Sequence, residues 1–399
     1  MKTTSMLRVR GVPVGGSAPV ELLIEKGVVR KCAKPPRDTV PDLGDGETLL
    51  APVLFDFQVN GAFGIDLQRD GFSVDDVVAL SWKLAARGVG AWLPTLITSP
   101  VDLMARRARV IAQAAPLCRR RGASVAGIHY EGPFISPEDG PRGAHPKAHV
   151  LAPNPKALKT LLDAAGRLPV CMTLAPELDG TVGAIKTLAK RPRTVAALGH
   201  HGANAEQINA AADAGARLCT HLGNGIATTL HRHNNPIWPQ LADTRLHVSL
   251  IADMHHLPPA ALTAIIRAKG ADRVVLISDA VSLAGMPPGH YDLFGAPVEK
   301  RADNKVCLSG TELLAGSGSL LFDCVINAAN HGGMTLPEAF AAASANPARL
   351  LGLPRPAWPP ATGKRAGFVA FKKTGRGARA SAELLFCFIN GNLYRNTGD

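Results

Sequence analysis

The stretch that decides the fold opens with Val53-Leu54-Phe55-Asp56-Phe57-Gln58-Val59 and closes with Arg273-Val274-Val275-Leu276-Ile277-Ser278. Between these two apolar runs, short β-like segments alternate with longer segments that carry apolar residues at three- and four-residue spacing. This alternation is typical of βα units and a parallel sheet. We count eight such runs: Val53–Val59, Gly90–Ile97, Ser124–Tyr130, Pro169–Leu174, Thr194–Leu198, Ala216–Thr220, His247–Ala252 and Arg273–Ser278. The pattern predicts an α/β protein with a TIM-like (β/α)₈ barrel, and a doubly wound open sheet is the alternative with the same local pattern.

The two ends of the chain have a different pattern from the middle. Both contain short β-like runs separated by Gly and Pro, such as Val20–Glu25 near the start and Gly367–Phe371 near the end. We therefore expect residues 1–52 and 358–399 to form one small β-sandwich domain, with the catalytic barrel spanning residues 53–357.

Composition limits the class of protein. Apolar residues make up 46% of the 399 residues, which is enough for a sizeable core. No apolar run is long enough for a membrane helix, and residues 1–10 lack the apolar segment of a signal peptide, so we expect a cytoplasmic protein with no membrane partner. The seven cysteines are dispersed and never form a Cys-x-x-Cys pair, which argues against a disulfide framework and a thiolate zinc site.

The formal net charge of +12 raises nucleic acid, a membrane surface or an anionic substrate as partners. The basic clusters, for example Arg119-Arg120-Arg121, lack interleaved aromatic residues and match no nucleic-acid-binding motif. We therefore expect no nucleic-acid partner.

Polar, titratable residues stand where four of the predicted strands end. They are Glu131, His200, His221 and Asp279, after the third, fifth, sixth and eighth runs. Because catalytic groups of a (β/α)₈ barrel come from the carboxyl ends of its strands, we expect these side chains to meet on one rim. Two imidazoles and a carboxylate suit Zn²⁺ or another borderline divalent metal, and Asp279 suits a separate general acid/base. Each residue alone would more simply cap a strand, but four on one rim favour a site.

Several longer blocks occur in an order known from one enzyme family. They are Ala51–Gly61, Trp92–Thr98, His129–Phe134, Thr173–Glu177, Gly199–His200, Thr220–Asn224, Ile251–Asp253, Ser278–Ala280, Ala315–Leu320, Asn346–Arg349 and Asn390–Asn392. In this order they resemble the amidohydrolase superfamily and, within it, the N-acetylglucosamine-6-phosphate deacetylase family. The resemblance spans most of the chain.

The resemblance implies roles for the rim residues. Glu131, His200 and His221 match the family's metal ligands, and Asp279 matches its general acid/base. His145, in the segment Gly143–Pro146, matches a histidine that contacts the substrate beside the acetyl group.

The resemblance also implies how a sugar phosphate binds. Asn224 matches a contact to the sugar phosphate, and Arg232 and His256 match a phosphate-binding arginine and histidine. In the family the arginine comes from the neighbouring subunit, so we expect a homodimer. A guanidinium fork suits a phosphate dianion.

Some positions depart from the related sequences. Many superfamily members carry His-x-His where this chain has Gln58 and Asn60, so we expect one metal ion, with Zn most suitable and Fe, Co, Mn or Ni open. Gly223 and the segment His231–Trp238 also differ from well-known deacetylases, and both belong to the substrate-reading part. Two interpretations stay open for four extra histidines: they contact an anion, or they lie at the rim or in solvent without a role. They are His201, His231, His233 and His255.

The expected reaction is the hydrolysis of an N-acetyl amide of an amino sugar, most simply N-acetylglucosamine 6-phosphate, to acetate and the free amine. Water activated by Asp279 would attack the carbonyl, with His145 near the carbonyl oxygen. One alternative is an amidohydrolase that acts on a non-phosphorylated N-acyl sugar, an N-acyl amino acid or a cyclic amide. A catalytically dead ligand-binding relative is disfavoured by the intact set of rim residues.

Overall fold

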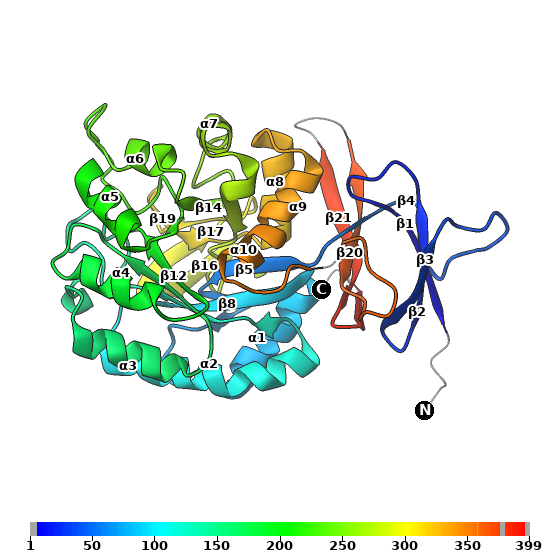
Figure 1. Ribbon diagram of the computed structural model, residues 1–399, viewed down its shortest axis with the longest axis horizontal. Helices are drawn as coiled ribbons and strands as arrows, with labels where there is room; N and C mark the ends of the chain where they lie inside the picture. The colour runs from blue at the N-terminus through cyan, green and yellow to red at the C-terminus, as the bar shows by residue number, and fades with distance from the viewer. Residues whose placement is uncertain (1–5, 357, 376–379, 396–399) are drawn as a thin grey trace.

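The computed structural model describes residues 6–356, 358–375 and 380–395. Its larger part is a nearly closed barrel of eight parallel strands (Figure 1). In chain order and in space these are β5 (Leu54–Val59), β8 (Val89–Ile97), β10 (Ile128–Glu131), β11 (Val170–Leu174), β12 (Thr194–Leu198), β13 (Leu218–Cys219), β14 (His247–Ile251) and β15 (Val274–Ile277). The prediction of a (β/α)₈ barrel is confirmed.

The barrel closes between its first and last strands. Just beyond β15, the Asp279 amide donates to the Gln58 carbonyl at 3.0 Å, and the Asn60 amide donates to the Ala280 carbonyl at 2.8 Å. These bonds join residues more than 200 positions apart, so the closure is a tertiary feature. The open-sheet alternative is thereby excluded.

Helices surround the barrel strands. They are α1 (Val74–Ala86), α2 (Val101–Arg121), α3 (Pro155–Ala165), α4 (Thr181–Ala189), α5 (Ala205–Ala214), α6 (Ile237–Ala242), α7 (Pro259–Lys269), α8 (Leu321–His331), α9 (Leu336–Ala342) and α10 (Ala345–Leu350). Local sequence sets several starts: Ser73 and Asn204 each form a capping box with the third residue of the helix they begin. At the amino-terminal end of the barrel, Ala348 of α10 packs into the interior with Phe55 and Val275, so this end is filled and only the opposite rim is available for a site.

The two chain ends meet in one sheet beside the barrel (Figure 1). Its order is β22-β21-β20-β4-β1-β2-β3, from β1 (Leu7–Pro13), β2 (Val20–Glu25), β3 (Val28–Ala33), β4 (Leu43–Ala51), β20 (Phe368–Thr374), β21 (Ser381–Ile389) and β22 (Asn392–Arg395). Leu22 and Val29 from the first half share a buried cluster with Phe368 and Phe388 from the second, as in a small sandwich. The domain limits at 52/53 and 357/358 stay a prediction.

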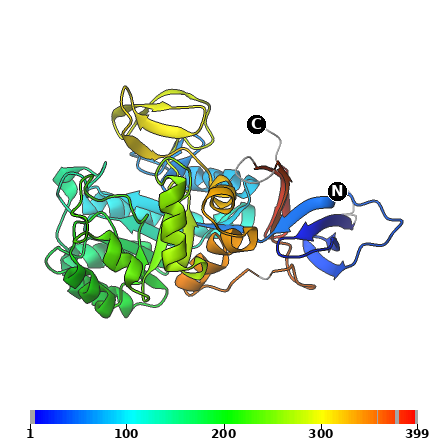
Figure 2. The same cartoon turned by 90° about the horizontal axis from the view of Figure 1, so that it is seen from above.

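A four-stranded antiparallel sheet follows β15 and has no counterpart in the sequence-based prediction. It consists of β16 (Gly289–Leu293), β17 (Ala296–Lys300), β18 (Lys305–Leu308) and β19 (Leu314–Ser317), and it projects from the barrel (Figure 2). Its core is small and includes Val298 and Val306. Two-residue strand pairs add to the barrel's edges: β6 (Gly61–Ala62) with β7 (Ile65–Asp66), and β9 (Ser124–Val125) with β8.

Within the described residues, we find no helix that is both long and apolar enough to cross a membrane.

Candidate metal centre and active site

Three predicted ligands converge at the carboxyl-terminal rim of the barrel. His221 Nε2 lies 2.8 Å and His200 Nε2 3.3 Å from Glu131 Oε1, and the two ring nitrogens are 3.2 Å apart. Ligand atoms held about 2.0–2.2 Å from a tetrahedral ion are about 3.3–3.6 Å from one another. The side chains are almost completely buried. This cluster could therefore hold one divalent metal ion.

Neighbouring groups set the protonation of these side chains in the way that cation binding requires. The Pro141 carbonyl can only accept, so His200 Nδ1, 2.8 Å away, carries the proton and leaves the Nε2 lone pair free for a ligand bond. Burial alone would raise the pKa of Glu131, but the His200 and His221 rings beside it hold the pKa well below its usual value. Glu131 is therefore ionised, as a ligand must be.

The backbone is strained where the chemistry-bearing residues stand. His200, His221 and Asp279 have φ values of 53°, 30° and 50°, in the left-handed region that residues with a Cβ rarely adopt. Such residues cost about 1–3 kcal/mol each and gather at functional sites. Gly225, at φ 60°, packs against the His200 ring, where an added Cβ would lie only 2.9 Å from Nδ1. The turn after each strand thus aims the side chain across the rim.

Asp279 is held by the two amides that replace the His-x-His motif. Gln58 Nε2 donates to Asp279 Oδ1 at 2.8 Å and also to Glu131 Oε1 at 2.9 Å, while Asn60 Nδ2 donates to Asp279 Oδ1 at 2.8 Å. Burial, and then the charge of Glu131, raise the pKa of Asp279 to about 8. The bonds to Oδ1 fix the orientation of a carboxylate able to exchange protons near neutral pH.

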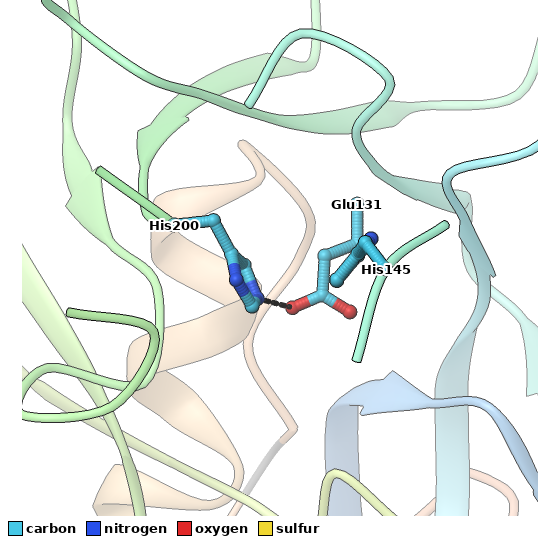
Figure 3. Close-up of side chains that lie close together, drawn as sticks. All are labelled: Glu131, His145 and His200. Atoms are coloured by element: carbon cyan, nitrogen blue, oxygen red, sulfur yellow. Dashed lines mark hydrogen bonds and ion pairs between the residues drawn. The ribbon is translucent and has the colours of Figure 1, made fainter. Parts of the chain in front are cut away.

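His145 lies beside the cluster (Figure 3). Its ring centroid is 4.3 Å from that of His200, and Glu131, His145 and His200 all offer ligand atoms within 4.8 Å of one another. His221 Nε2 contacts Glu131 Oε1 at 2.8 Å and His200 Nε2 at 3.2 Å, so it also lies within reach of an ion held by this cluster. The His145 Nδ1 atom is engaged by Thr98, which follows β8 directly.

One cavity contains most of the residues predicted from the sequence. Its lining includes Glu131, His145, His200, His221, Asn224, His256 and Asp279. His256 is oriented by Asp253, whose Oδ2 lies 2.8 Å from His256 Nδ1. Two regions of the cavity were not predicted: Phe294 at the tip of the β16–β17 hairpin, and residues 314–316 of β19. Residues 315 and 316 fall in the block Ala315–Leu320 that resembles the family, but that block carried no site assignment, and Phe294 lies outside every block.

Arg232 is the one predicted site residue that does not line this cavity. It lies exposed in the segment between β13 and α6, where the Trp238 indole nitrogen donates to the Arg232 carbonyl at 3.0 Å. Among the described residues that line the cavity there is no lysine or arginine.

The four extra histidines do not line the cavity among the residues described. His201 is buried and accepts a hydrogen bond from the Ala203 amide at 3.2 Å, and burial lowers its pKa to about 4. His255 Nε2 lies 3.0 Å from the Asp303 carbonyl, so it links the loop after β14 to the inserted sheet. His231 and His233 are exposed.

Comparisons with known proteins agree with this geometry. A family model described as "Amidohydrolase family" matches residues 82–393. The chain is 36% identical to N-acetylgalactosamine-6-phosphate deacetylase from Escherichia coli O157:H7, over 81% of this chain and 83% of that protein. It is 35% identical to N-acetylglucosamine-6-phosphate deacetylase from Homo sapiens, over 77% and 76% of the two chains.

A solved structure is similar over nearly the whole fold. It is a mutant of N-acetyl-D-glucosamine-6-phosphate deacetylase from Mycobacterium smegmatis, in complex with N-acetyl-D-glucosamine-6-phosphate. The two chains share 28% identity with a TM-score of 0.83, over 98% of this chain and 99% of the other.

Proposed function

We propose a reaction from the premise that this chain belongs to the amidohydrolase family and is an enzyme that hydrolyses amide bonds. The proposed substrate is an N-acetylated amino sugar 6-phosphate, with N-acetylglucosamine 6-phosphate first, and the products are acetate and the free amino sugar phosphate. The observation that carries the proposal is the convergence of Glu131, His200 and His221 beside Asp279 in one open cavity.

The donor set supports one divalent metal ion, Zn²⁺ in the first place. Two imidazole nitrogens and a carboxylate are a common set for catalytic zinc, and the Gln58 and Asn60 amides occupy the position where a second ion would need stronger ligands. A bound divalent ion would lower the pKa of water and polarise a carbonyl oxygen.

Asp279 supplies the proton transfers. Its Oδ1 is held by Gln58 and Asn60, so Oδ2 is available to take a proton from the attacking water. When the carbon–nitrogen bond breaks, the same carboxyl returns the proton to the leaving nitrogen, which departs as an amine. His145 lines the cavity beside the metal cluster and suits a hydrogen bond to the carbonyl oxygen, where negative charge develops.

The phosphate group is proposed to bind at the outer part of the cavity. His256 and Asn224 line it, but a phosphate dianion also calls for a strong cation. Arg232 is exposed in the segment between β13 and α6, and the Trp238 indole nitrogen donates to its carbonyl. We propose that this arginine enters the cavity of the neighbouring subunit of a homodimer.

A substrate panel tests the proposed function. Zinc-loaded protein is assayed for acetate release from the 6-phosphates of N-acetylglucosamine and N-acetylgalactosamine, from the two sugars without phosphate, and from N-acetyl amino acids. We expect both phosphates to rank above the rest in kcat/KM, and their ratio decides the epimer. Preference for an unphosphorylated sugar or an amino acid would overturn the proposed substrate class, although not the amide hydrolysis.

A further inference from the structure

The strongest unassigned feature of the site is a pair of contacts at His145. The Thr98 backbone N–H points at His145 Nδ1 over 3.3 Å, and Thr98 Oγ1 lies 2.9 Å from the same nitrogen. Both residues are buried. Thr98 is not a member of the metal cluster and does not line the cavity among the described residues, so it has no direct role in the reaction proposed above.

The backbone contact at 3.3 Å favours one position for the His145 proton, and the hydroxyl contact at 2.9 Å adds to it. An amide N–H can only donate, so His145 Nδ1 must be an acceptor without a proton. An imidazolium would carry protons on both nitrogens and is therefore incompatible with this contact. The remaining form is the neutral ring with its proton on Nε2.

We propose that Thr98 is a positioning residue that fixes His145 as the Nε2–H tautomer and so makes it a hydrogen-bond donor rather than a metal ligand. A ligand nitrogen needs a free lone pair, and in this tautomer Nε2 has none while the Nδ1 lone pair is taken by Thr98. His200 shows the opposite arrangement, since the Pro141 carbonyl holds the proton on Nδ1 and frees Nε2. The two neighbouring imidazoles are thus set for different tasks by their hydrogen-bond partners.

The threonine hydroxyl also packs closely against Gly132, where a built Cβ would lie 2.1 Å from Thr98 Oγ1. A glycine at this position therefore leaves room for the hydroxyl beside His145 Nδ1. The inference rests on the proposed function in one respect: the group that accepts the hydrogen bond from Nε2–H is the carbonyl oxygen of the substrate.

The test compares Thr98→Val, which removes the hydroxyl at nearly constant shape, with Thr98→Ser, which restores it. Because the backbone donor remains in both, we expect Thr98→Val to lower kcat about tenfold, less than the loss of a whole oxyanion donor. KM and the metal content should stay within twofold, and Thr98→Ser should recover most of the rate. Thr95→Val is the matched control, since Thr95 is a buried β8 threonine whose hydroxyl accepts from the Val59 amide. It should leave kcat within about threefold.

Imidazole ¹⁵N shifts of histidine-labelled protein provide a readout independent of activity. The His145 signals, assigned by their loss in His145→Asn, should show a protonated Nε2 and an accepting Nδ1 in the unsubstituted protein. In Thr98→Val the population of that tautomer should fall. A protonated Nδ1 in the parent, or an unchanged kcat in Thr98→Val, would overturn the inference. Absence of deacetylation by the parent protein would instead count against the proposed function, while the tautomer measurement would still stand.

Discussion

At the scale of single residues, the proposed function assigns metal binding and proton transfer to different residues. Glu131, His200 and His221 share one set of close contacts, and Asp279 is tied to that set only through Gln58. Substitutions in the two groups should therefore have different consequences.

Asp279→Asn should retain metal and lose turnover. The amide cannot exchange protons, so we expect kcat to fall by about 10²–10⁴-fold, while elemental analysis finds metal at the level of the parent protein. Activity close to that of the parent would remove Asp279 from the role of general acid/base.

His200→Ala and His221→Ala should lower metal content and rate together. Each removes one of three donors, and loss of a donor weakens a buried metal site directly. Metal content is measured after dialysis against a fixed free zinc concentration. His256→Ala, which changes the cavity at a residue whose ring contacts Asp253, is the control and should keep its metal. Full occupancy in either histidine variant would exclude that residue from the ligand set.

At the scale of elements, the inserted sheet contributes a wall of the cavity. Phe294 sits at the tip of the β16–β17 hairpin, at φ 56° and 39% exposed, and lines the cavity. The following strands return the chain to the barrel, where the Ser317 amide donates to the Asp279 carbonyl at 3.3 Å. The inserted sheet is therefore joined to the barrel at Asp279.

Phe294→Ala should weaken substrate binding more than the chemical step. Burying part of one aromatic ring is worth about 1 kcal/mol, so we expect KM to rise about five- to tenfold with kcat within twofold. Leu313→Ala removes an exposed apolar side chain, 63% accessible, from the same sheet and should change neither constant. Equal kinetics for the two variants would show that the phenyl ring does not contact the substrate.

The seam between β5 and β15 should make stability depend on pH. Asp56 is buried there and accepts from the Ser278 amide at 3.1 Å; burial raises its pKa from 3.8 to about 7. The folded chain therefore binds more protons than the unfolded chain between these values, and the contribution of Asp56 to the free energy of unfolding decreases as pH rises through this window.

Asp56→Asn should remove that contribution. We measure the free energy of unfolding by urea titration at pH 5 and at pH 7.5. It should be lower at pH 7.5, and this decrease should be a few kcal/mol larger for the parent protein than for the variant. Asp75→Asn, at an exposed position on α1, is the control. The same pH dependence in the parent and in Asp56→Asn would contradict the raised pKa.

At the scale of the whole molecule, the described residues that line the cavity include no lysine or arginine, and Arg232 is exposed in the segment between β13 and α6. A symmetric dimer, in which the segment carrying Arg232 enters the cavity of the other subunit, would explain both observations. Such an exchange predicts complementation between two defective chains.

Arg232→Ala should raise KM for the phosphorylated substrate and change that for the plain sugar little, and Asp279→Asn should be nearly inactive. A heterodimer of the two, purified with two tags, contains one site with both Asp279 and the other subunit's Arg232. We expect it to recover about half of the parent activity on the phosphorylated substrate. No recovery would mean that the arginine acts within its own subunit.

The sequence by itself determined the order and nature of the barrel strands. The run Thr194–Leu198 has the observed bounds of β12, because the period of a strand is a local property. It also determined which residues stand at strand ends, and in a parallel barrel this is enough to predict that Glu131, His200, His221 and Asp279 share a rim.

Only the tertiary structure decided how these residues are set for their tasks. The Gln58–Asp279 bond spans 221 positions, and the contacts of His145 with Thr98 and of His200 with Pro141 span 47 and 59. The inserted sheet was missed because its strands, such as Gly289–Leu293, are short and carry little apolar alternation. Tautomers, carboxyl pKa values and the walls of a cavity depend on which atoms face one another across the barrel, and no local pattern records that.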